Sequence, residues 1–453
     1  MPISITSFKA YDIRGRLPDQ LNEDIAYRIG NATAAFLDAR TVVLGRDIRL
    51  SSAKLADAVS RGLQEAGVRV LDIGLGGTEM VYFATGRLEA DGGIMVTASH
   101  NPKDYNGLKI VRSKAQPISA DTGLEDIRAL SEADARKTTA QVGSRESIDI
   151  SDEYIAHLLS YVDTAALQPL KIVVNAGNGG AGLVLDRLEP HLPFEFIKLH
   201  HEPDGDFPNG VPNPMLPENR QSTSQAVIEH GADLGIAWDG DFDRCFFFDN
   251  QGGFVEGYYI VGLLAETLLA GTTGEGIVFD PRLTWNTVEI VEAAGGRPIQ
   301  SRSGHSFMKA VMRAEHALYG GEMSAHHYFR DFYFCDSGMI PWLLVAELLS
   351  AGEDSLLDLV SSRIARFPAS GEINRRVDNA QAVMDRVWAA YQPDAIDSNR
   401  VDGISVAFEN WRFNLRASNT EPVIRLNVES RGDAALMREK THALLEMIGG
   451  DDD

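Results

Sequence analysis

The chain has 453 residues, which is too long for one ordinary hydrophobic core and predicts roughly three or four domains. Apolar residues make up 44% and charged residues 24%, as in folded globular proteins, so disorder is excluded for all but the tail at residues 449–453. With 42 Lys and Arg against 65 Asp and Glu, the formal charge of −23 excludes nucleic acid and anionic membranes as partners. An anionic ligand could bind such a chain only where cations are concentrated locally.

Hydropathy and cysteine content bear on where the protein resides. No segment approaches the roughly 20 apolar residues that cross a bilayer, and the strongest candidate, residues 339–349, contains Pro341 and Glu347 and predicts a buried helix. The first residues lack the charged and apolar regions of a signal peptide. Cys245 and Cys335 are the only cysteines, so neither a disulfide framework nor a thiolate metal cage is expected. We expect a cytoplasmic monomer.

A pattern of strands and helices occurs three times along the chain, each time ending in a polar motif. The first copy predicts, in order, strand 42–45, helix 51–67, strand 68–73 and strand 94–97. The second and third copies predict strands 171–175, 194–199, 234–238, 276–280, 297–301 and 317–319, with helical segments between them. Strands that alternate with helices indicate parallel α/β units, whose ligands bind beyond the carboxyl ends of the strands. The polar motifs are therefore expected at corresponding sheet edges.

The spacing of these units predicts four domains, over residues 1–144, 145–247, 248–364 and 365–453. The last one differs, because residues 404–408 and 423–428 alternate in polarity and a final helix follows. We interpret it as a small α+β domain. Three tandem α/β domains and this fourth one could face one another around a single central cleft.

The first polar motif, TASHNP at residues 97–102, places Ser99 on the turn after a buried strand. A turn rich in Ser, Asn and Pro is common, and for the motif alone this explanation is as good as a functional one. The basic residues His100, Lys109 and Arg14 in the same predicted domain favour a functional serine. A phosphoserine would carry about −1.5 to −2 charges and three acceptor oxygens, and it would need such partners.

The second motif, DGDFDR at residues 239–244, is the most specific one. Its three carboxylates repel one another unless a cation lies among them, and oxygen ligands favour Mg²⁺ or Ca²⁺. A calcium EF-hand is excluded, because its sixth and twelfth loop positions require Gly and Glu, and these are Arg244 and Asn250 here. We predict Mg²⁺ held by Asp239, Asp241 and Asp243, with Arg244 binding the same phosphate. A solvated acidic turn is the alternative.

The third motif, GGEMSAHH at residues 320–327, offers Glu322 and Ser324 as hydrogen-bonding groups for sugar hydroxyls. Its adjacent histidines could indicate zinc, but no further ligand cluster supports zinc, so His326 is a candidate base or a surface residue. His305, within SGHS at residues 303–306, is a second candidate base, and a structural role for it is equally open.

A fourth cluster, RASNTEP at residues 416–422, lies in the predicted C-terminal domain. The guanidinium of Arg416 can hold an anion in bidentate fashion, while hydroxyl and amide groups satisfy the remaining acceptors. Those groups belong to Ser418, Asn419 and Thr420. The composition predicts a phosphate-binding loop, with a turn or helix cap as the alternative.

Residues 177–182, GNGGAG, match the G-x-G-x-x-G pattern of dinucleotide-binding proteins after a predicted strand, and Glu202 follows about 20 residues later. By itself this pattern is weak. We interpret the glycines as a tight strand-to-helix turn, and an NAD-dependent oxidoreductase is the alternative from another reaction class.

Taken together, the motifs resemble the α-D-phosphohexomutase family, and within it the bacterial phosphomannomutase/phosphoglucomutase branch. The resemblance covers essentially the whole chain, with motifs in the family's order at residues 11–15, 97–102, 239–244, 321–326 and 416–420. Glu-Met-Ser in the third motif is similar to the branch that accepts mannose and glucose phosphates, whereas phosphoglucosamine mutases usually differ there. One departure is Phe242, where the commoner family form has glycine.

The resemblance implies roles for the residues of each motif. Ser99 would carry the phosphate and join the three aspartates as a Mg²⁺ ligand. Tyr11, Glu322 and Ser324 would contact the sugar, and residues 416–420 would bind its phosphate. The implied fold has three Rossmann-like domains and a fourth resembling the TATA-box-binding protein.

The implied mechanism passes the phosphoryl group from Ser99 to the C6 or C1 hydroxyl of a hexose phosphate. The resulting hexose 1,6-bisphosphate turns over and returns its other phosphate to the serine. A base is required in both half-reactions, and the candidates His305, His326 and Lys109 are not ranked. A phosphoglucosamine mutase is the alternative within the family.

Overall fold

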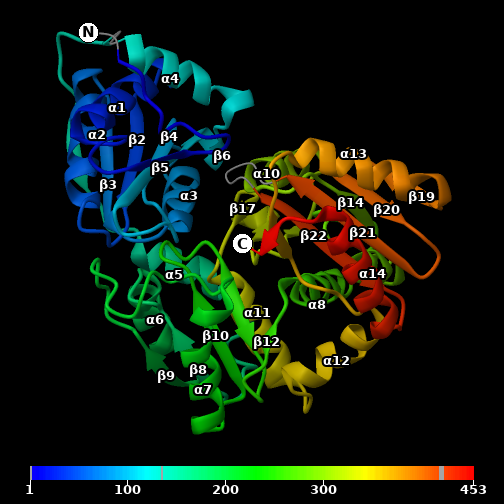
Figure 1. The fold of residues 1–453 in the computed structure, drawn as a ribbon. Helices are drawn as coiled ribbons and strands as arrows, with labels where there is room; N and C mark the ends of the chain where they lie inside the picture. The colour runs from blue at the N-terminus through cyan, green and yellow to red at the C-terminus, as the bar shows by residue number, and fades with distance from the viewer. Residues whose placement is uncertain (1–2, 134–135, 418–422, 453) are drawn as a thin grey trace. The chain divides into compact units, whose positions relative to one another are not determined.

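The computed structural model describes residues 3–133, 136–417 and 423–452 (Figure 1). The chain forms two compact units, Met1–Phe254 with His326–Glu353 and Val255–Ala325 with Asp354–Asp453. No helix within the described ranges is both long and apolar enough to cross a membrane. Each unit is larger than any one of the four predicted domains. This division therefore does not test the predicted domain boundaries, which stay predictions.

The first sheet of the first unit has the strand order β1-β5-β4-β2-β3-β7. Its strands are β1 (Ile13–Arg16), β2 (Thr41–Arg46), β3 (Arg69–Leu75), β4 (Gly92–Val96), β5 (Tyr105–Arg112) and β7 (Arg145–Ser147), and β6 (Gln116–Pro117) pairs with β5. The accompanying helices are α1 (Glu23–Leu37), α2 (Ser52–Glu65), α3 (Thr78–Arg87) and α4 (Leu124–Ala133). The predicted strands and helix of this segment are confirmed.

Alternation along β2 decides which helix covers which face of this sheet. Val42 and Leu44 belong to the core that α1 and α2 complete. Gly45, the residue after Leu44, faces the other way, where Val81 of α3 packs against it. Because successive side chains of a strand point to opposite faces, helices lie on both sides of the sheet.

The second sheet orders its main strands β11-β10-β8-β9. They are β8 (Lys171–Asn175), β9 (Glu195–Leu199), β10 (Leu234–Trp238) and β11 (Cys245–Phe248), followed by the short β12 (Phe254–Val255), with helices α5 (Ser151–Leu159), α6 (Ala181–Leu188) and α7 (Gln221–His230). β8 pairs in parallel with both β9 and β10. β8 and β10 have the bounds that the sequence predicts.

A later segment of the chain completes the first unit. It contains β16 (His327–Phe329), β17 (Cys335–Asp336) and α11 (Ile340–Ala351), and α11 is the predicted buried helix. The carboxylate of Glu79 on α3 accepts hydrogen bonds from the backbone N–H groups of Gly338 (2.5 Å) and Met339 (3.2 Å). The indole of Trp238 donates to the carbonyl of Gly338 at 2.9 Å. These bonds anchor the start of α11 beside both sheets.

The second unit begins with parallel strands β13 (Gly276–Phe279), β14 (Arg297–Gln300) and β15 (Tyr319–Gly321). Its helices in this part are α8 (Gly257–Leu269), α9 (Trp285–Ala293), α10 (His305–Glu315) and α12 (Leu356–Arg366). All three strands overlap predicted ones, and the residues that follow β13 and β15 carry the polar groups described below.

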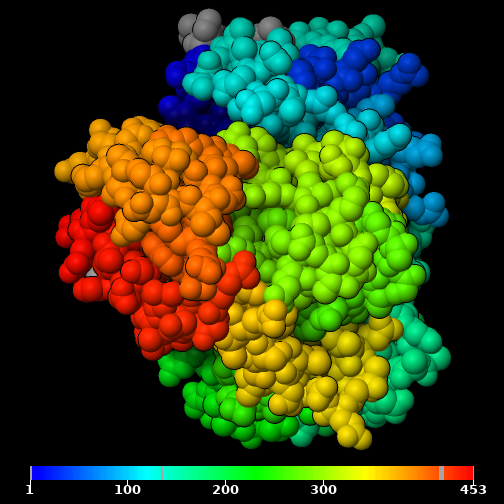
Figure 2. Space-filling model, turned by 90° about the vertical axis from the view of Figure 1, so that its right-hand side faces the viewer, coloured from blue at the N-terminus to red at the C-terminus, as the bar shows by residue number. Residues whose placement is uncertain are grey.

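The C-terminal part of this unit is an antiparallel sheet in the order β19-β20-β21-β22-β18-β23. Its strands are β18 (Ile373–Arg376), β19 (Asp397–Asn399), β20 (Ile404–Ala407), β21 (Trp411–Ala417), β22 (Val423–Ser430) and β23 (Asp451–Asp452), with helices α13 (Ala380–Tyr391) and α14 (Ala434–Ile448). Val387, Phe413 and Leu444 share one core between the helices and the sheet. Figure 2 shows the side chains of this segment, from orange to red, gathered in one continuous body. The predicted α+β domain is confirmed.

Candidate active site and metal centre

Ser99 lies three residues beyond the end of β4, in a backbone conformation that few residues other than glycine adopt. Its φ is +48°, and its side chain is almost fully buried. The backbone N–H of Ser99 donates to Thr97 Oγ1 (2.9 Å), and the Ser99 hydroxyl donates to Asp239 Oδ2 (2.6 Å). Ser99 is thus in direct contact with Asp239, 140 positions later, in the DGDFDR loop at residues 239–244, which we call the metal loop.

The three aspartates of the DGDFDR loop converge on one point. Each offers a carboxylate oxygen, and these oxygens lie within 4.8 Å of one another. The Oδ1 atoms of Asp239, Asp241 and Asp243 are buried and have no hydrogen-bond partner among the described residues. A buried acceptor without a partner is costly, and a set of hard oxygen donors is what Mg²⁺ prefers. The residues therefore fit the predicted metal.

The other oxygens of these carboxylates are held by hydrogen-bond donors of the surrounding strands and helix. Lys109 Nζ on β5 donates to Asp241 Oδ2 (2.8 Å) and to Asp243 Oδ2, and Thr78 Oγ1 at the start of α3 donates to Asp241 Oδ2 (2.5 Å). Arg244 donates to Asp239 Oδ2 from Nε (3.0 Å) and Nη2 (2.6 Å). The arrangement fixes each carboxylate and leaves one buried oxygen of each without a hydrogen-bond partner among the described residues.

Charge within this cluster shifts several pKa values. Burial alone would lower the pKa of Lys109, but Asp241 and Asp243 raise it above its usual value. Burial opposes ionisation of Asp241, yet Lys109 and Arg14 hold its pKa below the usual range. Burial and the neighbouring Asp241 charge raise the pKa of Asp243. Three carboxylates this close are not all ionised unless a further cation joins them.

His100 is an uncharged acceptor in this geometry. Its Nδ1 lies 2.5 Å from Arg244 Nη2 and 3.0 Å from Ser99 Oγ. Since a guanidinium only donates hydrogen bonds, Nδ1 must accept one. Desolvation and the charges of Arg244 and Arg14 hold the pKa of His100 well below its usual value. Arg14 itself donates to Asn101 Oδ1 (3.1 Å) in the serine loop.

Phe242 occupies a position whose backbone favours glycine. Its φ is +44°, which explains physically why a glycine is common there in the resembling family. The fully buried Phe242 ring lies where Gly77 and Gly180 lack side chains, since a Cβ at those glycines would come within 2.3 Å and 2.8 Å of it. The ring packs against the starts of α3 and α6. Phenylalanine in place of glycine therefore does not prevent the three carboxylates from acting as metal ligands.

The two adjacent histidines, His326 and His327, have different surroundings, and His326 lies beside the metal loop. His326 Nε2 is 4.0 Å from Asp243 Oδ1 and 3.8 Å from Asp336 Oδ2, and its ring stacks on that of Tyr328. His327 is fully buried, and this burial lowers its pKa to about 3. Of the adjacent histidines, His326 is therefore the candidate base.

Glu322 and Ser324 follow β15 in the second unit and share an arginine that the sequence prediction missed. Arg282 Nη2 lies 3.5 Å from Glu322 Oε1 and donates to Ser324 Oγ at 3.3 Å. The backbone N–H of Gly304, next to His305, donates to Glu322 Oε1 at 2.9 Å. The predicted sugar loop and the predicted second base thus belong to one local network.

Arg416 lies near the end of β21 and belongs to a group of arginines around one acid. Its Nη2 donates to Glu372 Oε2 (3.2 Å), Arg425 Nη1 donates to Glu372 Oε1 (3.0 Å), and Arg282 Nη1 donates to Glu372 Oε2 (3.4 Å). These three guanidinium groups outweigh burial and lower the pKa of Glu372 to about 2. The other predicted phosphate ligands, Ser418, Asn419 and Thr420, lie outside the described residues, and Tyr11 lies two residues before β1.

Four polar residues that the sequence analysis missed take part in these clusters: Arg49, Thr78, Arg282 and Glu372. Arg282 follows the carboxyl end of β13, so the rule used for the other motifs could have found it. Arg49 and Thr78 likewise lie three residues beyond the carboxyl ends of β2 and β3, so the same rule could have found them. Glu372 lies immediately before β18 and carries no such signal, and only the folded chain brings it to its cluster.

The glycine-rich turn at residues 177–182 is filled by the metal loop. A Cβ at Gly179 would lie 2.9 Å from the carbonyl oxygen of Gly240, and Gly180 accommodates the ring of Phe242. The turn joins β8 to α6, as interpreted from the sequence. Because the metal loop packs directly on these glycines, the geometry does not favour a dinucleotide there.

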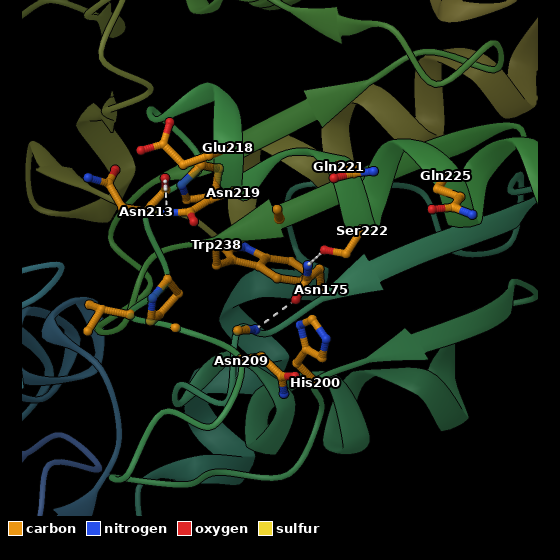
Figure 3. Close-up of a pocket in the computed structure, with 16 residues that line it drawn as sticks. Asn175, His200, Asn209, Asn213, Glu218, Asn219, Gln221, Ser222, Gln225 and Trp238 are labelled. Atoms are coloured by element: carbon orange, nitrogen blue, oxygen red, sulfur yellow. Dashed lines mark hydrogen bonds between the residues drawn. The ribbon is translucent and has the colours of Figure 1, made fainter.

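A cavity of about 380 Å³ lies at the same sheet edge, between the ends of β8 and β10 and the start of α7 (Figure 3). Its polar lining is mainly amide side chains, among them Asn175, Asn209, Asn219 and Gln221. Figure 3 shows these groups around Trp238, the residue immediately before the metal loop. Since no Lys or Arg is among the described residues that line it, the cavity is poorly suited to a phosphate.

Comparison with family models and known proteins gives a consistent result. Models of phosphoglucomutase/phosphomannomutase alpha/beta/alpha domains I, II and III match residues 6–137, 152–253 and 256–367. The model of the C-terminal domain of the same family matches residues 372–446. Together the models cover most of the chain in order.

Individual relatives are similar over nearly their whole length. A protein named "Phosphohexose mutases" from Xanthomonas campestris pv. campestris is 60% identical over 448 residues, covering 99% of this chain and 100% of that protein. A "Phosphomannomutase" from Salmonella typhimurium is 60% identical over 451 residues, covering 98% and 99%. A crystal structure of a phosphoglucomutase/phosphomannomutase family protein from Burkholderia thailandensis is 32% identical, with a TM-score of 0.88, over 100% of this chain and 99% of that one.

Proposed function

The chain belongs to the phosphoglucomutase/phosphomannomutase family, and from that premise we propose that it interconverts hexose 1-phosphates and hexose 6-phosphates of mannose and glucose. The reaction proceeds through a phosphoserine at Ser99 and a hexose 1,6-bisphosphate. One observation carries the proposal: the Ser99 hydroxyl lies 2.6 Å from Asp239 Oδ2, in a loop with three buried carboxylate oxygens that lack partners among the described residues.

We assign Asp239, Asp241 and Asp243, with a Ser99 oxygen, as the residues that would hold Mg²⁺. When bound there, the ion would offset the negative charge on the transferring phosphoryl group. The fit of the donor set supports this assignment, because three oxygens of one hard type converge within 4.8 Å. Arg244 and Lys109 hold the carboxylates from outside and keep their free oxygens in place.

In the first half-reaction, a sugar hydroxyl at C6 or C1 attacks the phosphorus of phospho-Ser99. The bond from phosphorus to the sugar oxygen forms, the bond to Ser99 Oγ breaks, and the hydroxyl proton passes to a base. The bisphosphate then turns over, and its other phosphate returns to Ser99 by the reverse chemistry. Phosphoryl transfer depends mainly on positioning and charge neutralisation, which the basic groups around Ser99 provide.

The remaining site residues take roles that suit the charge and hydrogen-bonding groups of their side chains. Arg416 and its neighbours bind the phosphate that does not react, and Glu322 and Ser324 contact sugar hydroxyls. Lys109 is bonded to two carboxylates and acts as a donor. The base is then His305 or His326, and variants of each, assayed for kcat in both directions, would distinguish them.

Mannose and glucose phosphates should be handled with similar efficiency. The two sugars differ only at C2, and a site whose sugar contacts lie elsewhere cannot discriminate strongly between them. The kcat/KM values should differ by no more than about 1–3 kcal/mol in transition-state stabilisation. A strong preference for glucosamine phosphate would instead place the chain in the phosphoglucosamine branch.

The decisive experiment is an isomerisation assay with mannose 1-phosphate and glucose 1-phosphate, Mg²⁺ and a catalytic amount of glucose 1,6-bisphosphate. Intact-mass and peptide mass spectrometry should find phosphate on Ser99, and Ser99→Ala should lose turnover by about 10⁴-fold or more while still binding hexose phosphate. Full turnover by Ser99→Ala would exclude the mechanism. NAD(P) should neither bind nor be reduced.

Two finer expectations complete the proposal. We propose that the protein acts in the cytoplasm, which cell fractionation would test. We also propose that it acts as a monomer, and light scattering after size exclusion should then give a mass near 49.5 kDa.

A further inference from the structure

Arg49 lies between β2 and α2, and its side chain is directed at the backbone of the Ser99 loop. The Arg49 side chain is 2% exposed. Nη2 donates to the carbonyls of Ser99 (2.9 Å) and Asn101 (2.5 Å), and Nη1 donates to those of Pro102 (2.8 Å) and Tyr105 (3.1 Å). A guanidinium carries four N–H groups on its two terminal nitrogens, so all four are used on this one loop.

The guanidinium is itself held from two sides. Asp47 Oδ2 lies 3.5 Å from Arg49 Nε, and Asp47 Oδ1 accepts from the Arg49 backbone N–H (3.1 Å) and from the Ser52 hydroxyl (2.5 Å). The ring of Phe207 lies under the guanidinium carbon at 5.3 Å. A planar, delocalised cation fixed in this way is a rigid template for the carbonyls that it binds.

The Ser99 carbonyl connects the serine loop to the metal loop. A Cβ at Gly240 would lie 2.7 Å from this oxygen, so the two backbones are in close contact there. Ser99 has a φ of +48°, a conformation that persists only when surrounding contacts enforce it. Arg49 supplies such a contact at Ser99 itself and at three further carbonyls of the same loop.

We propose that Arg49 is a positioning residue for phosphoryl transfer, which fixes the Ser99 oxygen relative to the Asp239–Asp243 loop without touching the substrate. The inference rests on the proposed function, because it assigns Arg49 to the chemistry of Ser99. This role explains why the charged guanidinium of Arg49 is buried behind the loop that carries the reacting Ser99.

The kinetic test compares Arg49→Met, Arg49→Lys and Ser99→Ala with the wild type. A displacement of about 1 Å at a reacting atom can cost about 100-fold in rate, so kcat of Arg49→Met should fall about 100-fold. KM should change by less than about threefold, because the phosphate-binding residues are untouched. Arg49→Lys keeps a charge and up to three donors, so it should recover part of kcat. Arg69→Met, which removes an exposed ion pair with Glu146 on the same sheet, is the matched control and should leave kcat unchanged.

A second measurement is independent of activity. Hydrogen exchange followed by mass spectrometry should show faster exchange over residues 99–105 in Arg49→Met and Arg49→Lys, with β2 and β4 still protected as in the Arg69→Met control. If Arg49→Met does not fold, the exchange pattern and kcat of Arg49→Lys decide the question.

The outcomes separate the inference from the function on which it rests. Wild-type kcat in a folded Arg49 variant, together with a dead Ser99→Ala, would overturn the inference alone. Unchanged exchange over residues 99–105 would also overturn it. Turnover by Ser99→Ala would overturn the proposed function, and the assignment of Arg49 with it.

Discussion

The cluster of Ser99 and three aspartates in the first unit and the arginine cluster of the second unit combine the same kinds of side chain in opposite ways. Around Ser99, three carboxylates each keep one buried oxygen that no described residue satisfies. Around Glu372, a single carboxylate receives hydrogen bonds from three arginines. The first cluster thus has buried acceptors that lack a described donor, whereas the second gathers guanidinium donors, one of which, Arg282, also forms an ion pair with Asp280.

This difference indicates the kind of ligand that each cluster takes. Unsatisfied buried acceptors favour a cation, while guanidinium groups gathered at one place favour an anion. Neither conclusion depends on net charge, since the whole chain carries a formal charge of −23. The two clusters should therefore respond differently when one carboxylate or one cation is removed.

Among the substitutions that compare the two clusters, Asp241→Asn should have the largest effect. This change removes a charge from the metal loop, so kcat should fall about 10²–10³-fold, the range for losing one group that stabilises transition-state charge. Mg²⁺ affinity, measured by titration calorimetry, should fall with it, whereas Glu372→Gln should leave Mg²⁺ affinity unchanged. Equal loss of Mg²⁺ binding in both variants would contradict the division into a cation cluster and an anion cluster.

Acid should destabilise the second unit through Glu372. Its pKa is lowered from the ordinary value of 4.5 to about 2 in the folded protein. A carboxyl group with a depressed folded pKa stabilises the fold above its unfolded pKa, and that contribution, about 3 kcal/mol here, is lost as the pH falls from 4.5 towards 2. Denaturant unfolding between pH 7 and pH 2.5 should give a steeper decline for the wild type than for Glu372→Gln. Parallel curves would show that the arginines do not hold the acid.

Arg416→Ala should act mainly on binding. A hydrogen bond from a guanidinium to a phosphate is worth about 1.5–3 kcal/mol, so KM for hexose phosphate should rise about tenfold or more. Some fall in kcat is also expected, because remote binding energy helps to orient the reacting end. Steady-state kinetics and a Mg²⁺ titration on the same variant form the test. Loss of Mg²⁺ binding in the folded variant would show that the assignment of Arg416 to the anion-binding cluster is wrong.

The smallest effect should separate backbone strain from packing at Phe242. Both Phe242→Gly and Phe242→Ala remove the buried ring, but only glycine accepts a φ of +44° without cost. The glycine variant should therefore be more stable than the alanine variant by about 1 kcal/mol, against the usual order. Urea unfolding of the pair gives this difference. Mg²⁺ affinity should match the wild type in both, since the ring is not a ligand.

Several elements were predictable from local pattern alone. β8 and β10 have their predicted bounds because continuous apolar runs ended by glycine or aspartate leave little freedom for a buried strand. The DGDFDR loop was recognisable because three acids at alternate positions repel one another in any fold. The glycine-rich turn was correctly separated from a dinucleotide site, although its packing against Phe242 was visible only in the folded chain.

By itself, the sequence determined the α/β units, the α+β character of the C-terminal domain and the candidate residues, since these depend on periodicity and on residue type over short spans. Tertiary structure alone decided which groups meet. Thr78 and Lys109 reach Asp241 across more than 130 positions, and Arg49 reaches the Ser99 carbonyl across 50. Such contacts arise where parallel strands bring their carboxyl ends to one edge, and no local spacing encodes which side chain arrives there. The unpartnered carboxylate oxygens that favour a metal are likewise a property of the assembled site.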